Sequence, residues 1–116
     1  MQPIPLTAPV FHILVALSDG ERHGYAIMQD VASQTNDAVQ LGPGTLYGCL
    51  KRMLAAGLVE ESDERPDPAL DNSRRRYYRM TALGRQAARA EAERLENAVT
   101  AARSRKLLDA TAGVSA

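Results

Sequence analysis

PGTLYGCLKRMLAAGLVE, residues 43–60, is the segment that says most about how this chain folds. Pro43 suits the first position of a helix and Gly57 suits the position just after a helix end, so a helix is predicted between them. Leu58 and Val59 follow with no room for a long loop, which predicts that the helix leads directly into a strand. The apolar residues of the segment recur at helical spacing and form one face: Leu46, Leu50, Met53 and Leu54.

A second segment, RRRYYRMT at residues 74–81, predicts a strand that returns alongside the first. Its tyrosine pair favours sheet structure, and Thr81 is suited to cap a final helix over residues 82–108. The intervening residues 66–73 hold two prolines and three Asp or Asn residues, a composition typical of a turn region. A charged strand over residues 60–65 and this return strand form a hairpin, the only β-structure that we predict.

Two further helices are predicted upstream. The first covers residues 7–18, with Thr7 as its cap, and ends at Asp19-Gly20. Three helices followed by a hairpin predict a mainly α-helical fold of the winged helix-turn-helix type, in which the helix before the hairpin enters the DNA major groove. The second helix covers residues 24–34, and the residues expected on its apolar face are Tyr25, Met28, Val31 and Ala32.

The final helix carries a shallow apolar stripe made largely of alanine, with Glu91 intruding on it. We expect this stripe to meet a copy of itself, because so long a helix cannot fold back on so small a body and be covered. The chain therefore divides into a DNA-binding domain at 1–81, a C-terminal dimerisation helix at 82–108 and a disordered tail at 109–116. The dimer contacts predicted on the first and last helices are Phe11, Leu14, Leu95, Ala98, Val99 and Ala102.

The composition narrows the class of protein. The 116 residues carry 14 basic and 14 acidic side chains, so the net charge is zero. That balance argues against a general polyanion binder, and contact with nucleic acid must come from where the charges are placed. The single cysteine, Cys49, rules out an internal disulfide and fits a reducing cytoplasm; we expect it to pack inertly, with a redox switch as the alternative. No apolar run approaches the roughly 20 residues of a membrane span.

The motifs of common enzyme and metal sites are missing from the sequence. We find no nucleophile elbow, no phosphate-cradling loop and no carboxylate pair in a pocket-forming context. His12 and His23 lie far apart, and with a single cysteine they do not make a metal site. We therefore expect neither catalysis nor a cofactor, and we expect His12 to pack or to contact a partner chain.

The exposed face of the helix at residues 43–57 carries groups suited to DNA. Its N-terminal amides can hold a phosphate, and its glycines allow a backbone to approach closely. The wing arginines can reach a phosphate or the minor groove, or can instead pair with the acidic side chains among residues 60–64. His23 either touches a phosphate or lies in a turn. The predicted DNA contacts are His23, Tyr25, Gly44, Thr45, Tyr47, Lys51, Arg52, Arg74, Arg75 and Arg76.

Several of these motifs together resemble the PadR family of bacterial transcriptional regulators: Gly24-Tyr25, residues 43–47, Leu58-Val59 and residues 75–81. The single helix after the hairpin is similar to the shorter subfamily. The resemblance implies a homodimer, usually a repressor, that binds a palindromic operator, with C-terminal helices packing against N-terminal helices. Some family members respond to phenolic acids or bind flat hydrophobic drugs, and the lack of tryptophan here argues against multidrug sensing.

Three functions remain open on the sequence. The first is a dimeric, sequence-specific repressor that binds double-stranded DNA. The second is a winged-helix module that binds another protein and not DNA, with the acidic strand at residues 60–64 as its best support. The third adds a small aromatic effector to the first function, and it predicts an apolar cavity between Phe11, Leu14 and the final helix.

Overall fold

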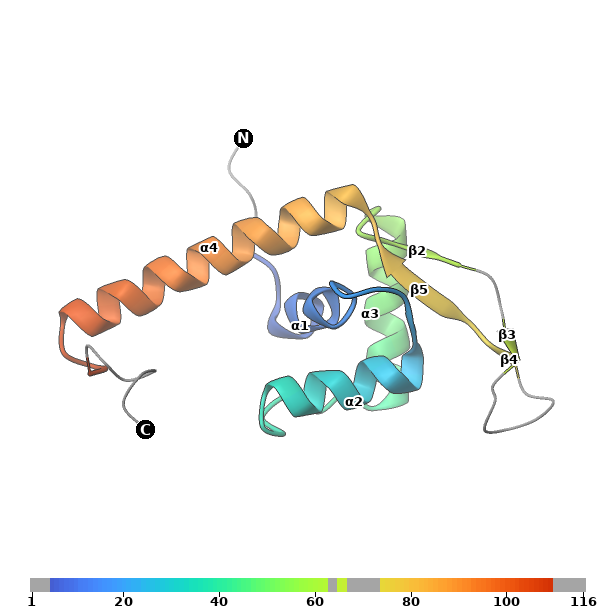
Figure 1. The fold of residues 1–116 in the computed structure, drawn as a ribbon, viewed down its shortest axis with the longest axis horizontal. Helices are drawn as coiled ribbons and strands as arrows, with labels where there is room; N and C mark the ends of the chain where they lie inside the picture. Colours follow the sequence, from blue (N-terminus) through green and yellow to red (C-terminus); the bar gives the residue numbers. More distant parts are fainter. Residues whose placement is uncertain (1–4, 63–64, 67–73, 110–116) are drawn as a thin grey trace.

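The computed structural model describes residues 5–62, 65–66 and 74–109. Within these residues the helices are α1 (Ala8–Ala16), α2 (Gly24–Gln34), α3 (Pro43–Ala55) and α4 (Ala82–Ser104). The strands are β1 (Arg22–His23), β2 (Val59–Glu61), β3 (Arg65–Pro66), β4 (Arg74–Arg75) and β5 (Tyr77–Met80). Figure 1 shows α4 lying across one side of the molecule with α1 beneath it, while the strands extend from the end opposite the C-terminus of α4. The predicted mainly helical, winged arrangement is confirmed.

Threonine side chains begin two of the helices, as predicted. Thr7 Oγ1 accepts a hydrogen bond from Val10 N at 3.4 Å at the start of α1, and Thr81 Oγ1 accepts one from Gly84 N at 3.0 Å at the start of α4. Each bond satisfies an amide that has no partner within its own helix. The two predicted helix starts are therefore correct to within a residue.

A residue with a left-handed backbone conformation follows each of the helices α3 and α4. Gly57, with a φ of 76°, follows α3 as predicted. At the end of α4 the left-handed residue is Lys106, with a φ of 64°, and Leu107 N donates to Ala102 O at 2.9 Å. The prediction that this helix runs to residue 108 is wrong, because a left-handed residue cannot continue a right-handed helix.

A hydrophobic core lies between α1, α2, α3 and the sheet, and the predicted face of α3 contributes to it. The face predicted for α2 is wrong in part: Tyr25 is 51% exposed and Ile27 is buried in its place, because Gly24 rather than Tyr25 lies against α3. Leu14 is fully buried in this core, so it has no surface left for a partner chain, contrary to its predicted role. The other buried hydrophobic residues are Ile13, Ala16, Leu17, Val31, Leu41, Leu46, Cys49, Leu50, Met53, Val59 and Tyr78.

The described sheet has three antiparallel strands in the order β1-β5-β2. Tyr78 of β5 pairs with Glu61 of β2 on one side and with Arg22 of β1 on the other. The expectation of a lone hairpin is therefore wrong, since β1 was not predicted. At two residues β1 is too short to show the alternation that marks a strand in a sequence. The predicted return strand is also interrupted at Arg76, and β4 pairs with β3 in a separate two-stranded sheet.

The first half of α4 packs on the body and the second half extends away from it (Figure 1). A Cβ on Gly84 would lie 3.0 Å from both the Leu58 carbonyl carbon and Met80 Cγ, and would overlap the Leu58 carbonyl oxygen, so α4 approaches the β2 junction closely. Glu91, which intrudes on the apolar stripe, is 5% exposed and accepts a hydrogen bond from Leu6 N at 3.1 Å. Residues 92–101 are all exposed.

Two predicted segments lie outside the described residues: most of the turn at 66–73 and residues 110–116 of the predicted tail. Within the part that is described, no helix combines the length and the apolar character needed to cross a membrane.

Candidate nucleic-acid interface

The N-terminus of α3 is open to solvent. Gly42 is its cap residue and supplies no side chain to bond the first amides. A Cβ added at Gly42 or Gly44 would meet nothing within 4 Å, and Pro43 and Thr45 are exposed as well. Unpaired amides at a helix start carry partial positive charge and bind phosphate readily. The predicted contacts Gly44 and Thr45 thus lie where a phosphate can reach them.

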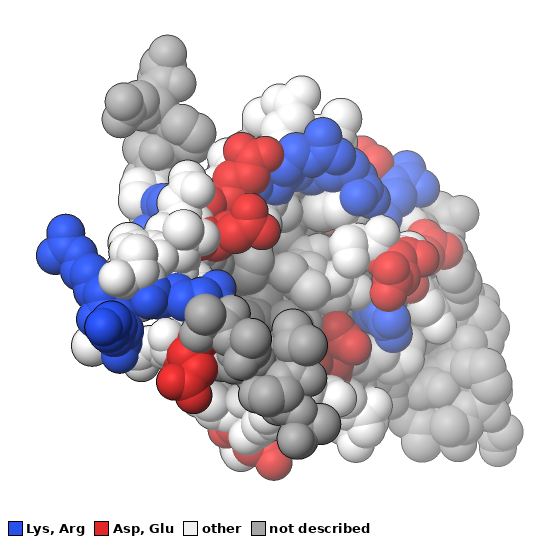
Figure 2. Space-filling view, turned by 60° about the vertical axis from the view of Figure 1, so that its left-hand side comes forward, with Lys and Arg blue, Asp and Glu red and all other residues white. Residues whose placement is uncertain are grey.

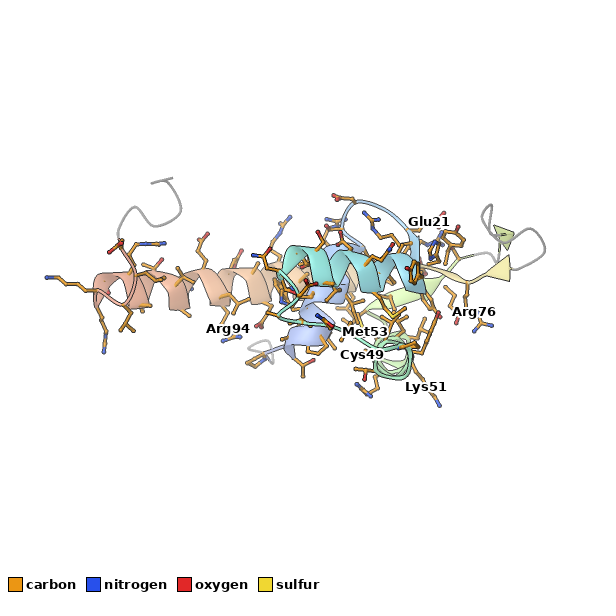
Figure 3. All side chains as sticks on the ribbon, turned by 90° about the horizontal axis from the view of Figure 1, so that it is seen from below. Glu21, Cys49, Lys51, Met53, Arg76 and Arg94 are labelled. Atoms are coloured by element: carbon orange, nitrogen blue, oxygen red, sulfur yellow. The ribbon has the colours of Figure 1, made fainter. Side chains whose placement is uncertain are left out.

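The rest of the exposed face of α3 is basic and aromatic. Tyr47 is 47% exposed, and both Lys51 and Arg52 are exposed. In Figure 3 Lys51 points away from the body of the protein, whereas Cys49 and Met53 lie on the side of α3 that faces the other helices. Arg52 Nη2 lies 3.4 Å from Cys49 Sγ, so this guanidinium lies along the helix surface. One helix therefore combines a buried face with a face that is free to meet a partner.

The wing arginines divide into those that pair with acidic residues and those whose side chains lie outside the described part. Arg76 Nη1 lies 3.4 Å from Glu61 Oε1, and Arg79 Nε lies 2.7 Å from Glu60 Oε1. Both pairs are solvent-exposed, and exposed pairs typically contribute only about 0–1 kcal/mol, so a phosphate can compete for the arginines. Arg74 and Arg75 form β4, but their side chains are not described. The cross-strand alternative thus holds for Arg76.

His23 has a structural place that the sequence did not predict. It is the second residue of β1 and the cap of α2, where its Nδ1 accepts a hydrogen bond from Ala26 N at 3.2 Å. Its ring also lies edge-on to the ring of Tyr77, with 5.4 Å between centroids. The turn alternative is therefore wrong, since His23 lies in a strand and caps a helix, and the predicted contact of His23 with a phosphate stays a prediction. Tyr25, two residues further along the chain, is exposed on the outward face of α2.

Tyr78 of β5 is a titratable residue of the core. It is buried, and burial raises the pKa of its phenol, as does the carboxylate of Glu61. Arg76 lowers the same pKa through its charge and a hydrogen bond, and the phenol of Tyr47 raises it.

Among the described residues, basic and acidic side chains are both spread over the face of the molecule that carries the C-terminal part of α4 (Figure 2). This mixture agrees with the zero net charge of the chain. In a protein of zero net charge, contact with DNA depends on where the cations lie, and Lys51 and Arg52 lie on the exposed face of α3.

The outer half of α4 exposes an apolar strip. Leu95 is 37% and Val99 is 41% exposed, with Ala98 exposed beside them and Ala102 half-buried. Phe11 of α1 is half-buried beside the first half of α4. Of the predicted dimer contacts, all but Leu14 are therefore at least partly accessible to a partner chain.

A groove of about 250 Å³ lies between α1 and the first half of α4. Its lining is mostly apolar and includes Phe11, with Arg85 and Arg89 as its basic members. It matches the position predicted for an effector cavity. No group of three His, Cys, Asp or Glu side chains in the described ranges is arranged to hold a metal ion.

Comparison with known proteins gives the family. The sequence matches the Transcriptional regulator PadR-like family over residues 13–90. A transcriptional regulator of Mycobacterium tuberculosis is 34% identical over 96 residues, which cover 83% of each chain. An uncharacterised protein of Lysinibacillus sphaericus is 32% identical over 73 residues, and the match spans 63% of this chain and 64% of that relative.

Solved structures agree on the fold. A PadR family regulator from Clostridium difficile superposes with a TM-score of 0.69 at 20% identity, covering 84% of this chain and 97% of the other. PadR of Bacillus subtilis, solved in complex with operator DNA, superposes with a TM-score of 0.62 at 19% identity, covering 72% of this chain and 45% of that one. The family comprises transcriptional regulators and not enzymes, as the sequence led us to expect. On the match over residues 13–90, this chain belongs to the transcriptional regulator PadR-like family.

Proposed function

We propose that this chain is a homodimeric, sequence-specific DNA-binding regulator of the cytoplasm that represses transcription from a palindromic operator. The observation that carries the proposal is α3, whose N-terminus and one face are exposed beside the wing while its other face lies in the core. A helix held in this way can enter the major groove without disturbing the core. The complex of Bacillus subtilis PadR with operator DNA supports the same use of the fold.

The helix α3 and the wing have separate roles in the proposed complex. The first turn of α3, with Gly44 and Thr45, approaches a phosphate. Lys51 reaches further along the groove, and the exposed part of the Tyr47 ring contacts the duplex beside it. Arg52 is free to leave its place along the helix for a phosphate. The wing, with residues 74–76, lies against the neighbouring backbone or minor groove.

The exposed strip of α4 joins two copies. A twofold pair buries Leu95 and Val99 of each chain and places two α3 helices on successive turns of the duplex. Twofold protein symmetry calls for a palindromic site. In this proposal α4, over residues 82–104, acts as the dimerisation helix, and the winged part contacts the DNA.

Binding to the DNA upstream of its own coding region tests the proposal. We expect specific binding. The logarithm of the association constant should fall with the logarithm of the salt concentration, with a slope of about −0.9 for each phosphate contact. Lys51→Ala should weaken binding to all duplexes and lower the magnitude of that slope by about 1. Arg105→Ala, which removes one cation from the far end of α4, is the matched control and should bind as the wild type does.

Gly44→Ala probes the close approach of DNA. Because its Cβ would meet nothing in the protein, the fold should be unaffected, while operator affinity should fall as the methyl group enters the space of the duplex. Equal affinity of the wild type for every duplex, or recovery of a stoichiometric protein partner without an operator shift, would favour the protein-interaction alternative.

A second candidate function is relief of repression by a small aromatic ligand. The groove between α1 and α4 favours it, because an aromatic side chain and two arginines suit a flat molecule that carries an acidic group. Titration of aromatic acids into the protein–DNA complex should release DNA. Phe11→Ala should abolish the response, measured against the affinity for DNA of the same variant without ligand. An undiminished complex across these acids would leave a regulator without an effector of this class.

A further inference from the structure

Gly24 is the first residue of α2, and it is buried against α3. A Cβ at this position would lie 2.9 Å from Tyr47 Cζ and 3.3 Å from Leu46 Cδ2, and it would overlap the hydroxyl oxygen of Tyr47. The phenol of Tyr47 therefore occupies the space that any side chain at position 24 would take. The two residues come from different helices, and 23 positions of sequence separate them.

The backbone does not explain a glycine here. Among the described glycines, those with positive φ are Gly20 and Gly57, so the backbone at Gly24 suits any residue. Gly42 and Gly44 have open space around them, and Gly48 meets only the end of Arg52, at 3.7 Å. Gly24 differs from these because a functional side chain of α3 fills the place of its missing Cβ.

Tyr47 is also not an ordinary core residue. Almost half of it is exposed, so its ring can rotate toward solvent if its seat is taken away. In its present position the phenol lies against Gly24 at the start of α2. A ring that swung outward would leave this place between the helices and stand off the exposed face of α3.

We infer that Gly24 is a positioning residue for DNA binding, which seats the phenol of Tyr47 between α2 and α3 and so sets the surface that α3 presents to the duplex. The inference rests on the proposed function. It predicts that a single methyl group at position 24 leaves the fold in place and damages recognition. The damage passes through Tyr47, so it disappears when the tyrosine side chain is removed.

A double-mutant cycle tests this. Gly24→Ala, Tyr47→Ala and the double variant are compared with the full-length wild type for affinity to a labelled duplex from the upstream region. We expect Gly24→Ala to weaken binding about tenfold, the scale of one lost polar contact, and to change the Tm by less than about 5 °C. In the Tyr47→Ala background the same change at position 24 should have no further effect on affinity.

Two-dimensional NMR provides a readout that does not depend on DNA. The wild type should show a nuclear Overhauser contact between Gly24 Hα and the Tyr47 ring, and Gly24→Ala should lose the corresponding contact. Unchanged affinity of Gly24→Ala, an equal loss in both backgrounds, or unfolding of this variant would overturn the inference. Failure of the wild type to bind any duplex overturns the proposed function and the role in DNA binding with it, whereas absence of the NMR contact overturns the seating alone.

Discussion

The buried carboxylate of Glu91 accepts a hydrogen bond from the backbone amide of Leu6, with 3.1 Å between Oε1 and N, although 85 positions separate the two residues. Arg94 donates to both carboxylate oxygens, from Nε at 3.1 Å and from Nη2. Figure 3 shows Arg94 on the outside of α4. The charged residue that interrupts the apolar stripe thus ties the segment before α1 to the middle of α4.

Glu91→Gln should lower the Tm at neutral pH. The amide oxygen can still accept from Leu6 N, but the ion pair with Arg94 is lost, so the decrease should be smaller than that of Glu91→Ala, which also strands a partly buried amide. Thermal unfolding followed by circular dichroism gives the Tm of the wild type and of the two variants. Equal Tm values for all three proteins would show that the contact carries no stability.

The pH dependence of stability should also report this carboxylate. The hydrogen bond from Arg94, with a further contribution from Leu6 N, holds the pKa of Glu91 below its ordinary value of 4.5. Because the folded-state pKa is lowered, the contribution is fully present above the unfolded value and is lost as the pH falls through the folded value. The difference in Tm between the wild type and Glu91→Gln should therefore be constant near neutrality and shrink below about pH 4.5. A difference that grew in acid would contradict the assignment.

Gly84→Ala should be strongly destabilising. Its methyl group would overlap the Leu58 carbonyl oxygen, a backbone atom that cannot rotate aside, and overpacking of this kind costs about 1–3 kcal/mol or more. Urea unfolding gives the change in free energy. Gly44→Ala is the control, because its methyl group meets nothing and alanine is the better helix former, so stability should stay equal or rise by up to about 1 kcal/mol.

The two threonine caps should differ in strength. Thr81 Oγ1 accepts from Gly84 N and also donates to Gly57 O at 2.6 Å, so it joins the end of α3 to the start of α4. Thr7 makes one exposed contact at 3.4 Å. We expect Thr81→Ala to cost about 1–2 kcal/mol and Thr7→Ala about 0.5 kcal/mol in urea unfolding. A larger loss at Thr7 would show that α1 depends on its cap more than the geometry indicates.

Val99→Glu should break the proposed dimer. It places a charge in the middle of the exposed apolar strip, where a partner would have to bury it, so the dimer dissociation constant should rise at least about tenfold. Sedimentation equilibrium measures the change. Asn97→Glu puts the same charge on the opposite side of α4 and should leave the association unchanged. A monomeric wild type, or equal effects of the two variants, would argue against this strip as the interface.

Local sequence patterns were sufficient for much of the fold. The start and end of α3, its buried face and the cap of α4 depend on residues within a few positions of one another, and proline, glycine and threonine signal them directly. The exposed face of α3 follows from the same spacing, so Tyr47 and Lys51 could be chosen as candidate contacts from the sequence. The roles of Arg74 and Arg75 stay predictions.

Contacts between distant segments explain what was missed. The strand β1 has two residues and forms because β5 offers it a free edge, so no alternation marks it. Its last residue, His23, then becomes the cap of α2. The α2 face was in part assigned one position off, because the adjacent residues Ile27 and Met28 are both apolar, and only the approach of α3 to Gly24 selects between them.

The sequence by itself determined that the chain has a helix from Pro43 toward Gly57, a basic return segment and a long final helix, because these features follow from short-range hydrogen bonding and periodicity. Only the tertiary structure decided that Gly24 seats Tyr47 and that Glu91 holds Leu6. Each of these pairs brings together residues far apart in the chain, and their distance depends on how the helices pack. Packing is a property of all the elements at once, so no local pattern contains it.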